Sequence, residues 1–217
     1  METLAPGRRA GTGLLCLALA TLALLFAAGH AAALPTKLCK ANEASCSKAN
    51  TWTLAPENFK GTISTMKLVL PGYLTVSCNP GKFASTLAEG AGPLTGEVFK
   101  WNFFNCTPEG CGISTPATEG TGFSAEVEAT GGGNGTMKVG KAPTLVLTCS
   151  APAITCVYSA ASIQLSVQGG GVGVAAISTE SQLNKDFFKS SLNCTQTAIY
   201  AAKHLIVEPG LPVYVTN

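Results

Sequence analysis

Hydrophobic and polar residues alternate with a period of two through much of the chain. The clearest example is 123–130, where Phe123, Ala125 and Val127 alternate with polar side chains. A β-strand with one face in a core and the other in water produces this pattern. Alternation, or enrichment in Thr, Val and aromatic residues, also marks 62–70, 73–78, 99–103, 136–139, 144–149, 154–160, 162–168, 172–178, 195–207 and 213–216. The pattern therefore predicts about ten short strands.

Glycine, proline and asparagine separate these segments. Clusters of them occur at 71–72, 79–81, 131–135, 169–171 and 209–210. Asn134-Gly135 predicts a β-hairpin between 123–130 and 136–139, and the glycines before it predict a loop of more than two residues. No long helical period is present, and 182–190 is the best candidate for a short helix. Short strands with frequent turns favour an antiparallel β-sandwich or a barrel-like architecture.

The first 33 residues have the pattern of an export signal. Arg8 and Arg9 precede a 15-residue apolar stretch at 14–28, and small residues follow up to Ala33. A basic start, an apolar core of this length and an Ala-x-Ala end are typical of a cleaved secretory signal peptide. A membrane anchor would need about 20 apolar residues. We therefore predict a signal peptide at 1–33, secretion or a cell-envelope location, and no membrane partner after cleavage.

The remaining chain, 34–217, has the length of a single secreted β domain. The weakly patterned stretch 107–122 leaves a subdivision open. This part carries 12 lysines, no arginine and a net charge of +1. Arginine is the side chain best suited to bidentate contacts with phosphate and guanine. We therefore expect no nucleic-acid partner.

Eight of the nine cysteines lie beyond the export signal. They are Cys39, Cys46, Cys78, Cys106, Cys111, Cys149, Cys156 and Cys194. An even number of cysteines behind a signal peptide predicts a disulfide framework. Close spacing favours Cys39 with Cys46, Cys106 with Cys111 and Cys149 with Cys156, which leaves the two others for each other. The predicted fold is therefore an all-β, disulfide-stapled antiparallel β-sandwich or barrel-like architecture.

Metal and cofactor chemistry find little support in the sequence. No C-x-x-C pair occurs, and His204 is the only histidine of 34–217. Structural zinc sites combine cysteine and histidine ligands at short spacings. We therefore predict no metal site and no cofactor.

Two glutamates suggest a possible hydrolase. Glu126 and Glu128 lie two apart on one predicted strand and face the same way, with Glu97 as a further candidate. A glycosidase needs two carboxylates about 5–10 Å apart. The simpler interpretation is a solvated strand face that its charges keep soluble.

Two other constellations match catalytic patterns only loosely. Ser64 and Lys67 fit the S-x-x-K spacing of serine acyl-transferases, but that chemistry needs a helix where this sequence has a strand pattern. His204 and Asp186 are the only histidine and aspartate of 34–217, and no G-x-S-x-G motif accompanies them. We expect His204 on the solvent side of its strand. No catalytic residue is predicted.

Two tryptophans are candidates for different roles. Trp101 alternates in phase with Phe99 and Phe103, which favours a place in the core. Trp52 follows a polar stretch and is the better candidate for binding, because an aromatic ring with a polar edge can stack on a sugar or anchor a protein.

Four segments carry a family resemblance. They are the cysteine-containing 38–46, the glycine-rich 128–136, the Cys149/Cys156 pair and the closing 212–216. Together they resemble a group of secreted, cysteine-rich β proteins of actinobacteria, and the resemblance runs through most of the chain after residue 33. It implies export and a β architecture. The group has no assigned activity, so the resemblance implies no functional residue.

The chain also contains three N-x-[S/T] sequons, which begin at Asn105, Asn134 and Asn193. A eukaryotic host could glycosylate them. With an actinobacterial source, as the resemblance implies, they are turn and strand-edge asparagines. The sequence does not decide their use.

These observations favour a non-catalytic extracellular or envelope-associated β protein with a binding or structural role. Its partner is unknown, with cell-wall or extracellular polysaccharide and protein as the candidates. One alternative is a carbohydrate-binding module or glycoside hydrolase that acts on extracellular polysaccharide. A self-assembling coat component is another.

Overall fold

The computed structural model describes residues 35–49, 51, 59–89, 91–118, 120–170, 175–208 and 212–217. Every helix or strand among these residues is a β-strand, so the predicted all-β class is confirmed. The helix expected at 182–190 is wrong, because 182–185 continue a strand and a turn follows. The predicted signal peptide and Trp52 lie outside the described residues. Residues 34–217 form one compact unit.

The described residues form fifteen strands. These are β1 (Lys37–Cys39), β2 (Phe59–Leu70), β3 (Leu74–Cys78), β4 (Gly81–Ala88), β5 (Leu94–Phe103), β6 (Cys106–Thr107), β7 (Cys111–Ser114), β8 (Phe123–Gly131), β9 (Asn134–Val139), β10 (Thr144–Ser150), β11 (Ala153–Ser159), β12 (Ile163–Gln168), β13 (Ala175–Lys185), β14 (Thr197–Glu208) and β15 (Tyr214–Thr216).

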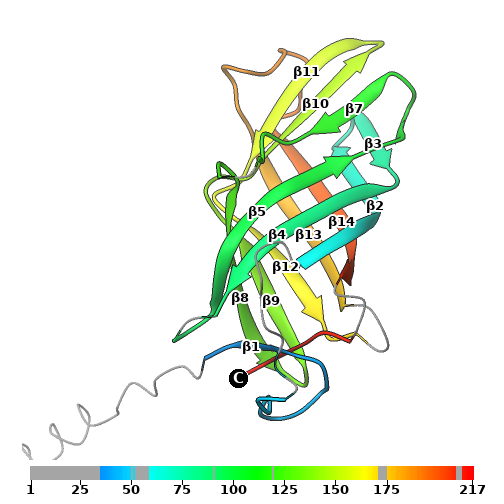
Figure 1. The fold of residues 1–217 in the computed structure, drawn as a ribbon. Coiled ribbons are helices and arrows are strands. Elements are labelled where there is room, and N and C mark those ends of the chain that lie inside the picture. The colour runs from blue at the N-terminus through cyan, green and yellow to red at the C-terminus, as the bar shows by residue number, and fades with distance from the viewer. Residues whose placement is uncertain are drawn as a thin grey trace, which may run out of the picture. The chain divides into compact units, whose positions relative to one another are not determined.

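Eight of these strands close into a ring through backbone hydrogen bonds (Figure 1). The order around the ring is β2, β4, β5, β8, β9, β12, β13 and β14, and every neighbouring pair is antiparallel. Strand β14 completes the closure, because it pairs with β13 on one side and with β2 on the other. The antiparallel, barrel-like architecture expected from the sequence is confirmed in this ring.

Five further strands extend one end of the ring, which is uppermost in Figure 1. Strand β2 is long enough to pair with β4 along its first half and with β3 along its second half. In the same way, β13 pairs with β12 near its start and with β11 at its end. Strand β6 then adds to β3, while β10 and β7 add to β11. We call β3, β6, β7, β10 and β11 the outer strands.

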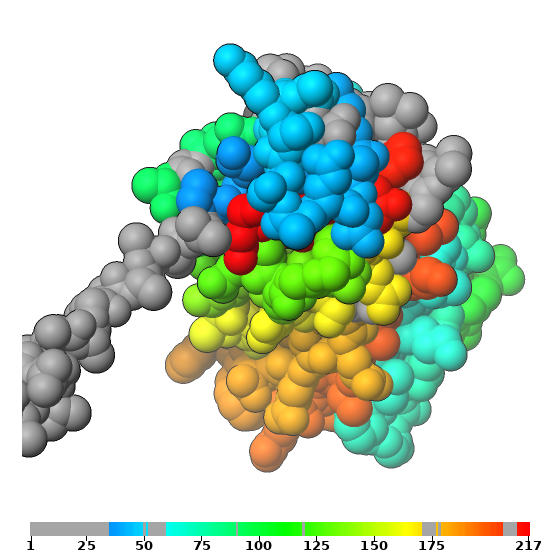
Figure 2. Space-filling view, turned by 90° about the horizontal axis from the view of Figure 1, so that it is seen from below, coloured from blue at the N-terminus to red at the C-terminus, as the bar shows by residue number. Residues whose placement is uncertain are grey.

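The N-terminal and C-terminal segments of the described chain cover the opposite end of the ring. Strand β1 pairs with β15, and Figure 2 shows the blue N-terminal segment and the red C-terminal segment lying over the green β8–β9 hairpin. Leu38, Val213 and Val215 are buried at this end. The Val215 N–H donates to Gly133 O at 2.9 Å. The ring is therefore closed at this end by the chain itself.

The β8–β9 hairpin that this cover rests on turns at Gly132 and Gly133. Both have positive φ, and Gly131 pairs with Asn134, so the turn contains two residues. The predicted hairpin is confirmed, while the longer loop expected for it is wrong. Glycine adopts positive φ at no steric cost, which explains the run of three glycines.

We expect Gly133→Ala to lower the free energy of unfolding by about 2–3 kcal/mol. The residue has φ +80°, and an added Cβ would lie 2.6 Å from Asn42 Oδ1 and 2.8 Å from Tyr214 Cδ1. Gly132→Ala is the control, because it has φ +64° but only an ordinary contact at 3.6 Å. Its expected loss is the backbone contribution alone, about 1 kcal/mol. Urea unfolding measures both variants, and equal losses would contradict tight packing of the covering segments.

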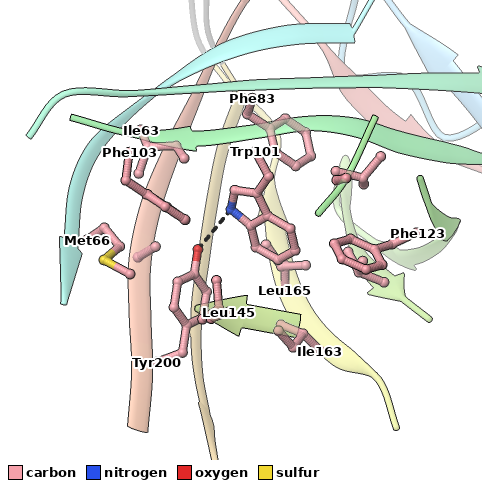
Figure 3. Packing of buried hydrophobic residues seen from close by; sticks show 14 of the residues in the cluster. Ile63, Met66, Phe83, Trp101, Phe103, Phe123, Leu145, Ile163, Leu165 and Tyr200 are labelled. Carbon is pink, nitrogen blue, oxygen red and sulfur yellow. Dashed lines mark hydrogen bonds between the residues drawn. The ribbon is translucent and has the colours of Figure 1, made fainter. Parts of the chain in front are cut away.

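Large side chains fill the interior of the ring (Figure 3). Trp101 of β5 is fully buried and packs edge-on against Phe83, Phe123 and Tyr200, with ring centroids 6.2, 6.2 and 5.7 Å away. Edge-to-face contacts at this range are favourable for aromatic rings. An eight-stranded ring has room inside for side chains and little else. The predicted core position of Trp101 is confirmed.

All eight predicted half-cystines form disulfides, but three of the four suggested pairs are wrong. The bonds are Cys39–Cys46, Cys78–Cys106, Cys111–Cys149 and Cys156–Cys194. Strand register explains two of them, since Cys78 lies opposite Cys106 in β3–β6 and Cys111 lies opposite Cys149 in β7–β10. Three bonds therefore secure the outer strands. Four disulfides indicate an oxidising environment.

Candidate functional site

The loop between β13 and β14 carries the most exposed large apolar side chains of the described residues. Phe187, Phe188 and Leu192 are 65, 101 and 96 % exposed. We call 186–193 the tip loop, and it projects beside β11 at the outer-strand end in Figure 1. Several large apolar side chains left exposed on one short loop are typical of an interaction site. The tip loop is therefore the candidate binding site.

Hydrogen bonds to β11 hold the tip loop in place. The N–H of Asp186 donates to Val157 O at 2.8 Å, and the N–H of Ser191 donates to Thr155 O at 2.7 Å. In return, the hydroxyl oxygens of Ser190 and Ser191 accept the N–H groups of Val157 and Thr155, both at 2.9 Å. Strand β13 pairs with β11 only at its end, so the loop takes the remaining edge of β11.

A disulfide and a lysine fix the two ends of the loop. Cys194, directly after the loop, is bonded to Cys156 of β11. Lys185, directly before it, donates from Nζ to Cys194 O at 3.0 Å and to Leu192 O at 3.4 Å. The same Nζ lies 5.4 Å from the centroid of the Phe187 ring. A loop held in this way presents its apolar side chains with little loss of conformational entropy on binding.

The only carboxylate of the loop is engaged within it. Asp186 Oδ2 lies 3.2 Å from Lys189 Nζ, and Asp186 Oδ1 accepts the N–H of Phe188 at 3.1 Å. Desolvation raises the pKa of the Asp186 carboxyl, but the hydrogen bonds from Lys189 and Phe188 outweigh it, so the net shift is downward. The carboxylate stays ionised and paired with Lys189 at neutral pH.

The β10–β11 hairpin beside the tip loop carries no charged side chain. Residues 142–179, which include the β10–β11 hairpin, contain no Asp, Glu, Lys or Arg. The turn of that hairpin exposes Ala151, Pro152 and Ala153. No side chain of this hairpin therefore carries a charge that a partner would have to desolvate.

His204 is buried in the ring, so its expected position on the solvent side is wrong. It lies on the face of β14 that also buries Tyr200 and Ala202, while Lys203 points out. Its ring centroid lies 5.0 Å from that of Phe83 and 5.9 Å from that of Trp101. His204 is therefore an interior residue.

A hydrogen-bonded chain of polar atoms runs through this aromatic core. Trp101 Nε1 donates to Tyr200 Oη at 3.1 Å, and Tyr200 Oη lies 3.2 Å from His204 Nε2 (Figure 3 shows the first of these bonds). The Tyr200 hydroxyl can accept from Trp101 and still bond to His204 Nε2, and the histidine tautomer decides which of the two groups donates in that second bond. His204 Nδ1 and the buried Ser85 Oγ have no hydrogen-bond partner.

Burial shifts the ionisation of both interior groups. Desolvation lowers the pKa of His204 from 6.5 to about 3. It also raises the pKa of Tyr200 strongly, against a smaller opposing contribution from the bond with Trp101. Both side chains are therefore neutral at neutral pH. An enclosed neutral imidazole without access to solvent cannot exchange protons with a substrate.

The glutamates of β5 and β8 lie on the outer face of the ring. Glu126 and Glu128 are exposed, and Glu126 lies opposite Lys138 of β9. A shallow hollow of about 240 Å³ beside Glu126 is lined by Ser124, Glu126, Lys138, Gly140, Lys141 and Ala161. Glu97 Oε1 accepts the N–H groups of Gly120 and Gly122 at 2.9 and 3.0 Å. The hollow thus holds one carboxylate and no aromatic ring, which does not resemble a glycosidase cleft.

The other catalytic patterns are not assembled. Ser64 lies on strand β2, as expected, and its hydroxyl donates to Lys203 O at 3.3 Å. Asp186 directly follows β13, whereas His204 pairs with Ile177 near the start of that strand. Nine residues of strand separate the two positions, which corresponds to about 30 Å. Asp186 and His204 therefore cannot act as a pair.

The remaining sequence candidates divide into two groups. Trp52, the predicted binding residue, is outside the described residues, as noted above. The sequon residues Asn105, Asn134 and Asn193 are all exposed. Asn134 Oδ1 accepts the N–H of Gly169 at 2.9 Å, which gives this side chain a structural role beside the hairpin.

Comparisons with family models, curated proteins and solved structures find no match to this chain. Within the described ranges, no group of three or more His, Cys, Asp or Glu side chains could hold a metal ion. Across the same residues, no helix has the length and hydropathy to cross a membrane. The local geometry of the chain is therefore the basis for proposing a function.

Proposed function

We propose that this is an exported, non-catalytic binding protein of the extracellular space or cell envelope, and that it engages its partner through the tip loop. The observation that carries the proposal is the exposure of Phe187, Phe188 and Leu192 on a loop fixed by a disulfide and by hydrogen bonds. Apolar side chains that stay in contact with water contribute no hydrophobic stabilisation to the folded protein. They lower the free energy only when a partner covers them and removes them from water.

Export and the family resemblance belong to the same proposal. Four disulfides support export, because such bonds persist in oxidising compartments. The resemblance to secreted proteins of actinobacteria is consistent with a cell-envelope setting. The ring provides the support, since its closed hydrogen bonding gives the outer strands and the tip loop a rigid base.

We expect the purified, disulfide-intact protein to be retained on an insoluble cell-envelope fraction, and Phe187→Ser/Phe188→Ser to reduce that retention at least about tenfold. The control is Phe104→Ser, which removes an aromatic side chain that is 40 % exposed and lies outside the tip loop. Co-sedimentation measures all three proteins. Equal retention of the double variant, or no retention of the wild type, contradicts the proposal.

A parallel measurement on insoluble wall polysaccharide tests the carbohydrate alternative. If the wild type and Phe187→Ser/Phe188→Ser are retained equally on this polysaccharide, the sugar-binding site lies elsewhere on the protein. That result would contradict the role of the tip loop. Far-ultraviolet circular dichroism of each variant checks that the fold is intact, as expected for the substitution of exposed side chains.

A further inference from the structure

We propose that the partner of the tip loop is the lipid surface of a membrane, into which Phe187, Phe188 and Leu192 insert. This inference rests on the proposed function and names the chemistry of its partner. It departs from the sequence-based prediction of no membrane partner after cleavage, because a nearly neutral protein without a membrane span can still insert exposed apolar side chains into a lipid surface.

The shape and size of the apolar surface favour a membrane over a protein partner. Phe188 and Leu192 are exposed about as fully as in an extended chain, so they project from the loop instead of forming a flat patch. An aromatic side chain buries about 150–250 Å², so the three residues offer roughly 500 Å² together. By themselves these three side chains would supply only part of the surface that each partner contributes to a stable protein interface, about 800 Å² with its polar rim included.

Several polar groups of the loop are satisfied inside the protein, which lowers the cost of bringing the loop to a lipid surface. Backbone N–H groups of Asp186, Phe188 and Ser191 have acceptors in the protein, and the hydroxyl groups of Ser190 and Ser191 accept from β11. Polar backbone without a partner would be costly to bring into lipid. A sugar-binding loop would instead keep such groups free for hydroxyls.

With Lys185 directly before it, the tip loop has a net charge of +1, which favours an anionic headgroup layer. Lys185 and Lys189 flank the two phenylalanines, and the Lys189 side chain is 71 % exposed. Long lysine side chains can keep their ammonium groups at headgroup level while apolar neighbours lie deeper. The only carboxylate of the loop, Asp186, is paired with Lys189, and the neighbouring β10–β11 hairpin carries no charge. No free carboxylate of the loop therefore faces the membrane.

Vesicle co-sedimentation of the intact protein tests the inference, with phosphatidylcholine alone and with a third of the lipid replaced by phosphatidylglycerol. We expect binding to both, tighter to the anionic vesicles. Phe187→Ser/Phe188→Ser is expected to weaken binding at least about tenfold, while Phe104→Ser leaves it unchanged. Lys189→Gln is expected to reduce the preference for phosphatidylglycerol, and Lys100→Gln, an exposed lysine of β5, is expected to have no effect.

A spectroscopic measurement gives a direct view of insertion. The tip loop contains no tryptophan, so Phe188→Trp adds a reporter at its most exposed position. We expect its fluorescence to shift to shorter wavelength when vesicles are added. The inference is overturned if the wild type stays in solution with both kinds of vesicle. It is also overturned if the double serine variant binds vesicles as well as the wild type does.

The two proposals fail in different ways. Envelope retention that needs Phe187 and Phe188, without binding to protein-free vesicles, keeps the tip loop as the binding site but makes its partner a protein or polysaccharide. Loss of both forms of binding removes the proposed function as well. Vesicle binding that depends on the two phenylalanines supports both.

Discussion

Reduction of the four disulfides is expected to lower the free energy of unfolding by more than about 10 kcal/mol, and thus to unfold the protein at room temperature. The four bonds close successive stretches of chain that do not overlap, with separations of 7, 28, 38 and 38 residues. Because the loops are independent, their restrictions on the unfolded chain add. A typical domain is stable by about 5–15 kcal/mol, so the sum is comparable to the whole stability.

Double alanine variants separate the contributions of the single bonds. Loss of Cys39–Cys46 is expected to cost about 2.5 kcal/mol, and loss of Cys111–Cys149 or Cys156–Cys194 about 4 kcal/mol, because the cost grows with the logarithm of loop length. Guanidinium unfolding of each variant measures these values. A larger loss for the shortest loop than for the longest ones would contradict the order. Peptide mapping without reduction checks the pairing itself.

The disulfides lie where hydrogen bonding gives the least support. The ring needs no covalent link, since each of its strands has two neighbours. Among the outer strands, β6 contains two residues and β7 four, and each ends a path of paired strands. Short edge strands contribute few hydrogen bonds, so a covalent link to β3 or β10 contributes most there. The third bond among the outer strands, Cys156–Cys194, joins β11 to the residue that directly follows the tip loop.

Sequence pattern predicted most strands because alternation reflects a ring with a packed inside and a solvated outside. Strand β4 was not predicted, and its register with β5 shifts between Ala84 and Ser85. Phe83, Ala84 and Ser85 are all buried there, so the period of two is interrupted. On β5, Phe99 takes the extra position and is only partly buried, although its phase relative to Trp101 predicts a core residue. β-Bulges break alternation without ending a strand.

The prediction of the disulfide pairs was wrong for three pairs because of how the strands are paired. Cys106 and Cys111 are close in sequence, but the strands that hold them pair with different neighbours, β3 and β10. Proximity in sequence favours a pair only if the chain reverses directly between the two residues. Cys149 and Cys156 flank a direct reversal, the β10–β11 hairpin, but Cys149 lies opposite Ile154 and Cys156 lies opposite Leu147, so the two are out of register. Cys39 and Cys46 are the one pair suggested correctly.

The tip loop could not be recognised from the sequence because apolar residues are ordinarily predicted to be buried. Phe187, Phe188 and Leu192 contributed to the expected helix at 182–190 and its flank, and their exposure depends on where β11 anchors the loop. His204 had a usable signal: it is in phase with Tyr200 and Ala202, which share its buried face. Its polar character outweighed that phase in the prediction.

The buried histidine leads to the second large effect, a loss of stability in acid. In the unfolded chain a histidine has a pKa of about 6.5, whereas burial lowers the pKa of His204 to about 3. Between these values the unfolded state binds more protons than the folded state, so acid favours unfolding. The contribution of the neutral histidine to the free energy of unfolding is fully present above pH 6.5 and is lost as the pH falls towards 3. Linkage gives a loss of about 3 kcal/mol between pH 7 and pH 4.

His204→Gln separates this effect from the titration of surface carboxylates. Glutamine can donate to or accept from Tyr200 and does not titrate. We therefore expect the free energy of unfolding of His204→Gln to fall about 3 kcal/mol less than that of the wild type between pH 7 and pH 4. Tyr200→Phe is the matched control, because it breaks the same hydrogen bond but keeps the buried imidazole. It should lower stability at all pH values and retain the full acid dependence. Urea unfolding at several pH values measures the free energy of unfolding of the three proteins. Parallel pH curves for His204→Gln and the wild type would show that His204 has the same pKa in the folded and unfolded states. We do not expect parallel curves, because His204 lies among Phe83, Trp101 and Tyr200 and its Nδ1 has no hydrogen-bond partner. A protonated imidazole at this buried position would cost too much free energy in the folded state.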